Sequence, residues 1–171
     1  MEEKVSYVFR KAEEADLPAI GAILRGAVAR MLAEGKRQWD ENYPNERHAA
    51  DDIANGVGYV MESDGEVVGY AAVVTSGEPA YTSIQGRWLT DGDYVVVHRM
   101  AVSRDVKGKG IGKTMMTAVE NLAGSLGIGS FRIDTNFDNT AMLALLSKLG
   151  FSYCGEIQYE HGSRKAFEKI L

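Results

Sequence analysis

The spacing of apolar residues predicts a long helix near the start of the chain. An apolar stripe at helical intervals runs through residues 17–34 and consists of Ile20, Ile23, Leu24, Ala27, Val28, Met31 and Leu32. Asp16 and Pro18 are typical of a helix start, and Gly35 is typical of a helix end. A short strand is expected before this helix at residues 7–11, and Asn45 can cap a second helix that ends near Gly56.

The middle of the chain has the pattern of β-structure. Residues 58–62 and 67–74 are strand-like and flank Ser63-Asp64-Gly65-Glu66, a strong hairpin signal. Residues 75–92 are polar, which predicts a long loop. Residues 94–102 form the most continuously apolar strand, which indicates a central position in the sheet.

The last third of the chain alternates between helical and strand patterns. One helical stripe consists of Ile111, Met115, Val119, Leu122 and Leu126, and a second consists of Met142, Leu145, Leu146 and Leu149. Asn139 can cap the second helix and Gly150 can close it. Strands are expected at residues 130–135, 151–157 and 165–171. The order β-α-α-β-β-β-α-β-α-β-β predicts one mixed α/β domain over residues 1–171, with a strand-helix-strand crossover.

Composition and charge narrow the class of protein. The 171 residues are 45% hydrophobic and 25% charged, which is ordinary for a folded domain. The net charge of -5 argues against a general nucleic-acid binder, and no apolar run approaches the ~20 residues that span a bilayer. Cys154 is the single cysteine, so neither an intrachain disulfide nor a cysteine metal cluster is expected. We therefore expect a cytoplasmic protein with a small ligand and with no metal, nucleic-acid or membrane partner.

The segment with the clearest chemistry joins the predicted central strand to the next helix. Its sequence is Arg104-Asp105-Val106-Lys107-Gly108-Lys109-Gly110-Ile111-Gly112-Lys113. Three alternating glycines leave backbone N–H groups uncovered, and the first helical turn adds further unpaired N–H groups. Because four cations stand against one acid on an acidic chain, the pattern predicts a cradle for a phosphorylated ligand. A surface turn with a solvated charge run is the alternative.

This segment does not have the spacing of a Walker A nucleotide loop. That motif requires a glycine six residues before the lysine of its Gly-Lys pair, and position 107 is Lys107. Gly108 also leaves three residues before Gly112, where the motif has four. A nucleotide triphosphatase is therefore a distant alternative.

Two motifs resemble those of the GNAT superfamily of N-acetyltransferases. After Met100-Ala101-Val102, the run from Lys107 to Gly112 is similar to that family's acetyl-CoA loop, Arg/Gln-x-x-Gly-x-Gly/Ala, with Lys107 in the Arg/Gln place. About 26 residues later, Asn136-Phe137-Asp138-Asn139 and then Leu149-Gly150-Phe151 resemble the family's Asn-x-x-Asn and Leu-Gly-Phe block. The resemblance covers nearly the whole chain. It implies a mixed, mostly antiparallel central sheet flanked by helices, with a V-shaped splay between the two central strands.

The resemblance also implies which residues bind acetyl-CoA, the co-substrate. Backbone groups near Met100, Ala101 and Val102 would pair with the pantetheine arm like an added strand. The pyrophosphate would be held by backbone N–H groups of Lys107, Gly108, Lys109, Gly110, Ile111, Gly112 and Lys113. Asn136 and Asn139 would face the pantetheine from the other wall, although Asn139 has a second interpretation as a helix N-cap.

Acetyl transfer to an amine requires a group that accepts the amine proton. His98 lies on the predicted central strand and has suitable chemistry, although a hydrogen-bonded sheet histidine is the alternative. Some members of the family carry Glu or His two residues upstream, where this chain has Val96. The weaker candidates are His48, His161, Glu62 and Glu156.

The departing thiolate also needs a proton, which the family's general-acid tyrosine usually donates. That position is Leu146 in this chain. Tyr153, Ser147 or a water molecule can donate instead, or the thiolate leaves unassisted. The absence of a tyrosine at position 146 keeps a second interpretation open, in which the chain is a non-catalytic acyl-CoA-binding sensor on the same fold. The backbone N–H near Met100 or Ala101 would polarise the thioester carbonyl.

The resemblance implies that the acceptor binds over the segment between the first two helices. Trp39 and Tyr43 there would form an aromatic wall for an amine, with packing onto the core as the alternative. Nearby acidic residues favour a cationic amine, namely Asp40, Glu41, Asp51 and Asp52. Small-molecule and peptide amines both stay open as acceptors. A homodimer is common among relatives, but no feature of the sequence requires one.

Overall fold

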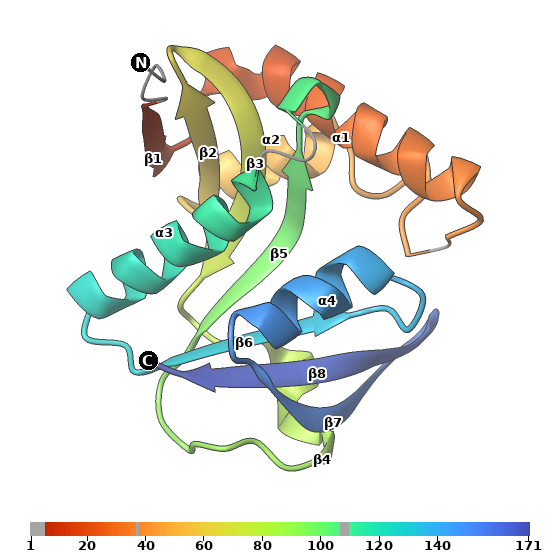
Figure 1. The fold of residues 1–171 in the computed structure, drawn as a ribbon, viewed down its shortest axis with the longest axis vertical. Coiled ribbons are helices and arrows are strands. Elements are labelled where there is room, and N and C mark those ends of the chain that lie inside the picture. Colours follow the sequence, from red (N-terminus) through yellow and green to blue (C-terminus); the bar gives the residue numbers. More distant parts are fainter. Residues whose placement is uncertain (1–5, 37, 107–109) are drawn as a thin grey trace. The chain divides into compact units, whose positions relative to one another are not determined.

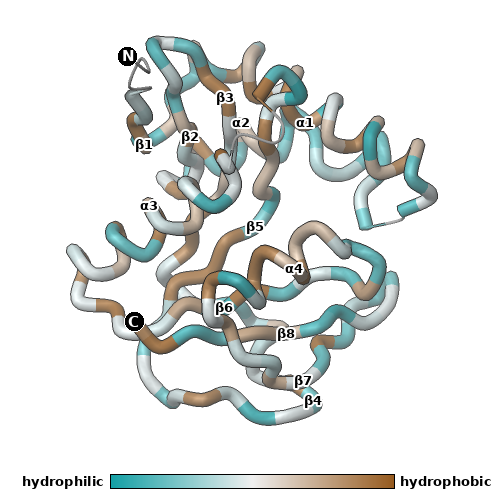
Figure 2. Tube along the Cα trace, in the orientation of Figure 1, coloured by the Kyte–Doolittle hydropathy of each residue, from teal (hydrophilic) through white to brown (hydrophobic). Residues whose placement is uncertain are grey.

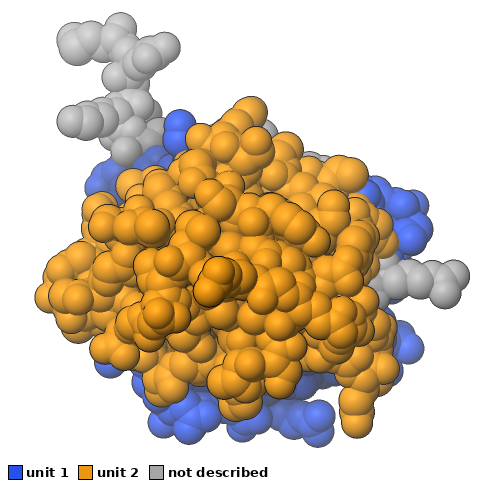
Figure 3. Space-filling view, turned by 90° about the horizontal axis from the view of Figure 1, so that it is seen from below, with its two compact units in different colours: residues 1–73, 99–116 blue, residues 74–98, 117–171 orange. Residues whose placement is uncertain are grey.

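The computed structural model describes residues 6–36, 38–106 and 110–171 and contains both helices and strands along the whole of this range (Figure 1). The chain divides into an N-terminal unit, residues 1–73 with 99–116, and a C-terminal unit, residues 74–98 with 117–171 (Figure 3). Strand β5 (Val95–Val102) and helix α3 (Ile111–Ser125) each contribute to both units. The strands form an eight-stranded, mostly antiparallel sheet, which confirms the predicted mixed α/β class.

The strands of the N-terminal unit follow the order β1 (Tyr7–Lys11), β2 (Gly58–Ser63), β3 (Glu66–Val74) and the end of β5. β1 pairs antiparallel with β2, and β2 pairs antiparallel with β3. The turn between β2 and β3 is the predicted one. Asp64 and Gly65 have φ values of 49° and 85°, the left-handed conformation that a tight two-residue hairpin turn needs.

The helices of the N-terminal unit are α1 (Leu17–Ala33) and α2 (Glu46–Ala54), with short 3₁₀ helices at Glu14–Asp16 and Arg104–Val106. The apolar stripe of α1 is buried from Ile20 to Val28, and hydrophobic and hydrophilic positions alternate along this helix in Figure 2. Leu32 is 51% exposed, so the last turn extends past the core. Asn45 caps α2 as predicted, by accepting a hydrogen bond from the Arg47 N–H at 3.0 Å.

Asp16 occupies the position before α1, but its side chain does not cap that helix. It accepts a hydrogen bond from the Glu13 N–H at 2.8 Å and from both terminal nitrogens of Arg10 at 2.8 and 2.9 Å. The hydrogen bonds from Arg10 lower the pKa of Asp16. This carboxylate therefore joins β1 to the start of α1 instead of capping the helix.

The strands of the C-terminal unit follow the order β5, β6 (Ser130–Thr135), β8 (Gly162–Ile170), β7 (Ser152–Tyr159) and β4 (Gln85–Gly86). In the described part of this unit, β5 and β6 are the parallel pair, and they pair at Val95 with Phe131 and at Val96 with Arg132, whereas the other pairs of the unit are antiparallel. β6 continues to pair with β8 as far as Thr135. Among the described residues, the β5–β6 ladder is therefore shorter than the β6–β8 ladder, which spans all of β6.

Helices α3 and α4 (Thr140–Lys148) agree closely with the predicted pair. Met115 and Val119 of the α3 stripe are fully buried, whereas Leu126 lies beyond the helix and is 57% exposed. Asn139 caps α4 by accepting from the Met142 N–H at 3.3 Å. Among the described residues, every helix is too short or too polar to cross a lipid bilayer.

The long polar loop predicted at residues 75–92 is present, but part of it has regular structure. The segment contains a 3₁₀ helix at Pro79–Ser83 and strand β4. Tyr81 is 1% exposed and its backbone carbonyl accepts from the indole N–H of Trp88 at 2.9 Å. These two aromatic side chains attach the segment to the C-terminal unit. The polar composition of residues 75–92 gave no indication of this packing. Strand β8 also begins three residues earlier than predicted, because pairing with β7 starts directly at Tyr159 and Gly162.

Candidate active site

Strand β5 carries the candidate reaction residues and is interrupted near its middle. Its first three residues are buried, and His98, Arg99 and Met100 are partly exposed. Arg99 has a φ of 55°, a left-handed conformation that is uncommon for a residue with a side chain. Interruptions of this kind redirect side chains and peptide groups relative to a regular strand.

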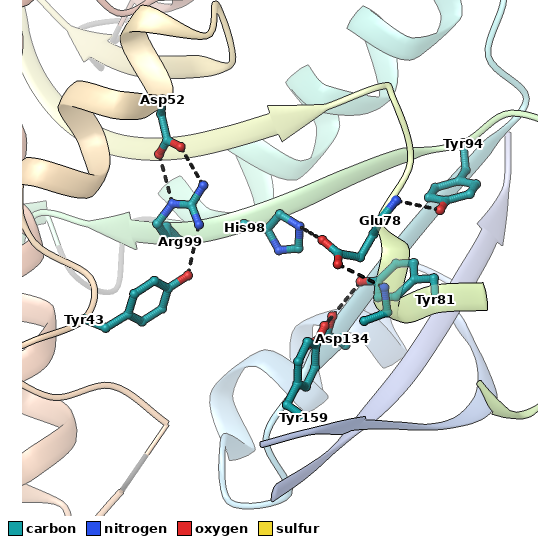
Figure 4. A network of polar contacts seen from close by, with 10 residues as sticks. Tyr43, Asp52, Glu78, Tyr81, Tyr94, His98, Arg99, Asp134 and Tyr159 are labelled. Atoms are coloured by element: carbon teal, nitrogen blue, oxygen red, sulfur yellow. Dashed lines mark hydrogen bonds and ion pairs between the residues drawn. The ribbon is translucent and has the colours of Figure 1, made fainter. Parts of the chain in front are cut away.

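In the N-terminal unit, a buried carboxylate holds Arg99 in this conformation (Figure 4). The Nε and Nη2 groups of Arg99 donate to the two oxygens of Asp52 at 2.9 and 2.6 Å. The Tyr70 hydroxyl also donates to Asp52, which is 6% exposed, and the Arg99 Nη1 group donates to the Tyr43 hydroxyl at 3.0 Å. The two-point ion pair fixes the position and the orientation of the guanidinium.

The surroundings shift the pKa values of three groups in this network. Burial alone would lower the pKa of Arg99, but the hydrogen bonds and charge of Asp52, with Tyr43, raise it overall. Burial and the Asp52 carboxylate raise the pKa of Tyr70 far above neutrality, so its hydroxyl stays a donor. Burial lowers the pKa of His48, and its Nδ1 accepts the Asn45 N–H at 3.1 Å, which gives His48 a role at the start of α2.

In the C-terminal unit, His98 contacts a carboxylate that the sequence did not single out (Figure 4). The Nε2 atom of His98 lies 3.1 Å from Oε2 of Glu78. The other oxygen of Glu78 accepts from the Ala80 N–H at 3.2 Å, and the Glu78 N–H donates to the Tyr94 hydroxyl at 2.9 Å. His98 is therefore hydrogen-bonded, as the alternative interpretation predicted. A hydrogen-bonded histidine can still act as a base, so that role stays a prediction.

Two tyrosines share one carboxylate beside this pair. The hydroxyls of Tyr81 and Tyr159 donate to Oδ2 of Asp134 at 2.6 and 2.9 Å. Burial, and then the charge of Asp134, raise the pKa of both tyrosines far above neutrality. Both hydroxyls therefore remain protonated and act as hydrogen-bond donors.

A second buried cluster attaches the segment before β5 to the sheet of the C-terminal unit. Glu168 is fully buried and accepts from the Leu89 N–H at 2.6 Å and from the Thr90 hydroxyl at 2.5 Å. Arg132 pairs with Glu168 at 3.2 Å, and its guanidinium lies 4.1 Å from the centre of the Tyr94 ring. Burial would raise the pKa of Glu168, but the hydrogen bonds lower it overall, so the carboxylate stays ionised.

The predicted pyrophosphate segment is described only in part. Lys107, Gly108 and Lys109 lie outside the described residues. Gly110 has a φ of 73°, and a side chain added there would meet no atom of the described residues within 4 Å. Its carbonyl accepts from the Thr114 N–H at 3.0 Å, so α3 begins directly after it. The N–H groups of Ile111, Gly112 and Lys113 belong to the first helical turn, which has no intrahelical acceptor for them.

The other predicted cofactor residues have local partners. The Val102 carbonyl accepts from Nη2 of Arg30 at 3.0 Å, while Met100 is partly exposed and Ala101 is 5% exposed. The Asn136 amide donates to Asp138 at 2.7 Å. Asn139 serves as the α4 cap described above, and a role for it toward pantetheine stays a prediction.

The position of the family's tyrosine and the candidate proton donor Tyr153 differ sharply in exposure. Leu146, at the family's tyrosine position, is fully buried in the core. Tyr153 is 57% exposed, and its ring packs edge-on against Phe167 with centroids 5.7 Å apart. Its hydroxyl is therefore accessible, and a role as proton donor stays a prediction.

Of the two aromatic residues expected to contact the acceptor, one is buried and one is exposed. Trp39 is 6% exposed and packs in the hydrophobic core of the N-terminal unit, so for this residue the alternative of packing onto the core is correct and the exposed wall is wrong. Tyr43 is 37% exposed and is held by Arg99. Asp52 is not a surface charge for a cationic amine, because its buried carboxylate is already paired with Arg99. Asp40 accepts from the Asn42 and Tyr43 N–H groups at 2.7 and 3.1 Å and so shapes its own loop.

Sequence reasoning missed Glu78 and the pairing of Arg99 with Asp52. Glu78 lies in the segment predicted as a loop, directly before Pro79, where a glutamate is unremarkable. Arg99 is a charged residue inside the most apolar strand, which was an available signal that a buried carboxylate would be needed nearby. The pattern gave no means of identifying that carboxylate.

Comparisons with known proteins agree with these observations. Residues 27–151 match the family described as the acetyltransferase (GNAT) family. A GNAT-family acetyltransferase from Streptococcus agalactiae is 34% identical, with 96% of this chain and 95% of that chain covered and a TM-score of 0.87. A ribosomal-protein-alanine N-acetyltransferase from Brucella melitensis is 26% identical, with 96% and 99% covered and a TM-score of 0.70.

A more distant structure supports the fold. It is that of a putative acetyltransferase from Salmonella typhimurium with its cofactor acetyl-CoA, 20% identical, with 96% of this chain and 94% of that chain covered and a TM-score of 0.67. Comparison with curated proteins gave no significant match. The family match spans more than half of the chain and the Streptococcus agalactiae structure spans nearly all of it, so this chain belongs to the GNAT family of acetyltransferases.

Proposed function

We propose that this chain is an N-acetyltransferase that moves the acetyl group of acetyl-CoA to a primary amine by direct attack in a ternary complex. The amine nitrogen forms a bond to the acetyl carbonyl carbon, the carbon–sulfur bond breaks, and CoA leaves as a thiolate. The amine loses one proton and the thiolate takes up one proton. Membership of the family supports acetyl transfer, and the relative described with acetyl-CoA supports the donor.

The observation that carries this proposal is the backbone conformation at Arg99 and at Gly110. The left-handed Arg99 interrupts β5 directly before Met100 and Ala101, whose peptide groups we assign to the acetyl carbonyl and the pantetheine arm. Gly110 adds no side chain over the first turn of α3, and Lys113 in that turn is exposed. Uncovered N–H groups, the helix dipole and one cation are a chemically suitable site for a pyrophosphate.

Side chains of the C-terminal unit are assigned to proton transfer. His98 accepts the proton of the amine, and the exposed hydroxyl of Tyr153 donates a proton to the thiolate. Asn136 contacts the pantetheine arm. In the N-terminal unit, Tyr43 offers an exposed aromatic face to the acceptor.

The acceptor is a small-molecule or peptide amine. The Brucella melitensis relative is named for a protein alanine acceptor, which supports the inclusion of peptide amines. We place the reaction in the cytoplasm, without a metal, and a homodimer stays a prediction.

Calorimetric titration with acetyl-CoA, with ATP–Mg²⁺ as the control ligand, tests the proposed cofactor. Saturable binding of acetyl-CoA alone is expected. Gly110→Ala forces a side chain into a left-handed residue at a cost of about 1–2 kcal/mol, which corresponds to an affinity lower by about 5- to 30-fold if binding requires this conformation. Gly124→Ala is the matched control, because Gly124 also has open space but lies within α3. Equal affinity of the two variants would contradict the assignment of Gly110.

A panel of small amines and peptide N-termini, with release of free thiol as the readout, tests the activity. Thiol release that depends on one class of amine supports the proposal and identifies the acceptor. Saturable acetyl-CoA binding with no thiol release across the panel would instead favour the acyl-CoA sensor. The leucine at position 146, where the family has a tyrosine, is the observation that keeps this alternative open.

A further inference from the structure

We infer that Glu78 is a positioning residue that places the proton of neutral His98 on Nε2, so that Nδ1 is the atom that accepts the amine proton. The catalytic part of this inference rests on the proposed function. The tautomer itself is a property of the protein and does not depend on any substrate.

The geometry of the pair determines the direction of the hydrogen bond. Nε2 of His98 lies 3.1 Å from Oε2 of Glu78, and the two side chains are 22% and 23% exposed. An ionised carboxylate can only accept, and a neutral imidazole carries one proton. The proton must therefore lie on Nε2, which leaves the lone pair on Nδ1. After proton uptake both nitrogens carry protons, and the Glu78 charge stabilises the imidazolium.

Glu78 is itself held by the residues on either side of it in the fold. Its Oε1 atom accepts from the Ala80 N–H at 3.2 Å, at the start of the 3₁₀ helix Pro79–Ser83. Its own N–H donates to the Tyr94 hydroxyl at 2.9 Å, and the Tyr94 ring stacks over the buried Arg132. One carboxylate oxygen thus fixes the backbone and the other fixes His98, the arrangement that orients a reactive ligand or base.

The neighbouring ionisable groups do not take the role of base. Tyr81 and Tyr159 stay protonated, and the charge of Glu78 contributes to the rise in the pKa of each. Oδ2 of Asp134 already accepts hydrogen bonds from both hydroxyls, at 2.6 and 2.9 Å. Within this cluster, Nδ1 of His98 is the basic atom that this hydrogen-bond arrangement leaves with a lone pair.

Nitrogen-15 spectroscopy of the histidine-labelled full-length protein tests the tautomer directly. The chain has three histidines, and His98→Asn identifies the signals of His98. We expect a protonated Nε2 and an unprotonated Nδ1 in the neutral form of the wild type. Glu78→Gln should give a mixture of tautomers, because an amide can donate as well as accept. A proton on Nδ1 in the wild type, or an unchanged spectrum in Glu78→Gln, would overturn the inference.

A matched control separates the carboxylate contact from general charge effects. Glu160 lies in the exposed turn between β7 and β8, in the same unit. Glu160→Gln removes one negative charge, as Glu78→Gln does, and should leave the His98 signals unchanged. Equal changes in the two variants would show that net charge, and not the contact, sets the tautomer.

A double-mutant cycle tests the catalytic part with the amine that the panel identifies. Glu78→Gln should lower kcat about 10- to 100-fold and leave the affinity for acetyl-CoA unchanged, since general-base catalysis contributes about 10²–10⁴-fold in total. In the His98→Asn background the same change should have no further effect, because Glu78 acts through His98. An equal loss in both backgrounds would overturn the positioning role. An absence of turnover with every amine would refute the proposed function, and the spectroscopy would still decide the tautomer.

Discussion

The pairing of Arg99 with Asp52 makes Asp52→Asn the most informative test of stability. An asparagine at this position keeps one oxygen that can accept from the Tyr70 hydroxyl, but its amide nitrogen cannot accept from Arg99. The substitution therefore leaves the guanidinium, whose side chain is 17% exposed, without its charged partner. It also removes the contact that holds Arg99 at its strained φ of 55°.

The expected magnitude follows from the burial of the pair. Removal of one partner of a buried ion pair costs about 3–5 kcal/mol. Arg99 keeps its contact with Tyr43 and some exposure to water, so we place Asp52→Asn at the lower end, about 3 kcal/mol. This value corresponds to a change of about 150-fold in the unfolding equilibrium.

Urea unfolding measures this difference through the transition midpoint, at an unchanged slope. The matched control is Asp51→Asn, which makes the same chemical change at the exposed neighbouring residue of α2 and should stay within about 0.5 kcal/mol of wild type. Asp52→Asn and Arg99→Met should be strongly non-additive, since each leaves the other partner buried. Equal stability of Asp52→Asn and Asp51→Asn would refute the structural role that we assign to this pair.

Three further predictions concern the C-terminal unit. Leu146→Tyr should destabilise the fold by about 1–3 kcal/mol and should not raise kcat, because a larger, hydroxyl-bearing ring overpacks a fully buried site; a faster and equally stable variant would contradict this. Tyr153→Phe keeps the ring contact with Phe167 and should lower kcat about 10-fold without a change in stability, whereas an unchanged kcat would exclude its hydroxyl as the proton donor. Because hydrogen bonds hold the pKa of Glu168 below its usual value, the wild type should lose stability as the pH falls below about 5, and Glu168→Gln should be less stable at neutral pH but lose less in acid. Parallel pH profiles of unfolding for these two proteins would refute that account.

The elements that the sequence predicted well are those with a local cause. Asp64-Gly65, Asn45 and Asn139 act within two or three residues of their own positions, as a turn and as two helix caps, and the structure has all three. The exposed ends at Leu32 and Leu126 were not predictable, because a periodic stripe does not show where the core beneath it stops. Tyr81 is a similar case, since its hydroxyl partner Asp134 is 53 residues away in the chain.

The same distinction between local and long-range causes applies to the candidate site. The glycine-rich start of α3 is recognisable because its chemistry resides in the backbone, and backbone chemistry leaves a composition signature. The carboxylates that fix β5 leave none, since Glu78 and His98 are 20 residues apart and Asp52 and Arg99 are 47 residues apart. Only the fold brings such partners into contact. A sequence pattern can therefore nominate His98 as a base but cannot say which of its nitrogens is available.

The two carboxylates act on consecutive residues of one strand. Glu78 fixes the side chain of His98, and Asp52 fixes the side chain of Arg99, whose backbone is strained by about 1–2 kcal/mol. Strain of that size persists when surrounding contacts over-determine the conformation, and here an ion pair and a tyrosine hydroxyl do so. Since these contacts lie within the protein itself, the interruption of β5 exists before any ligand binds. The peptide groups that we assign to the acetyl carbonyl are then oriented in advance, the condition under which electrostatic stabilisation of a transition state is most effective.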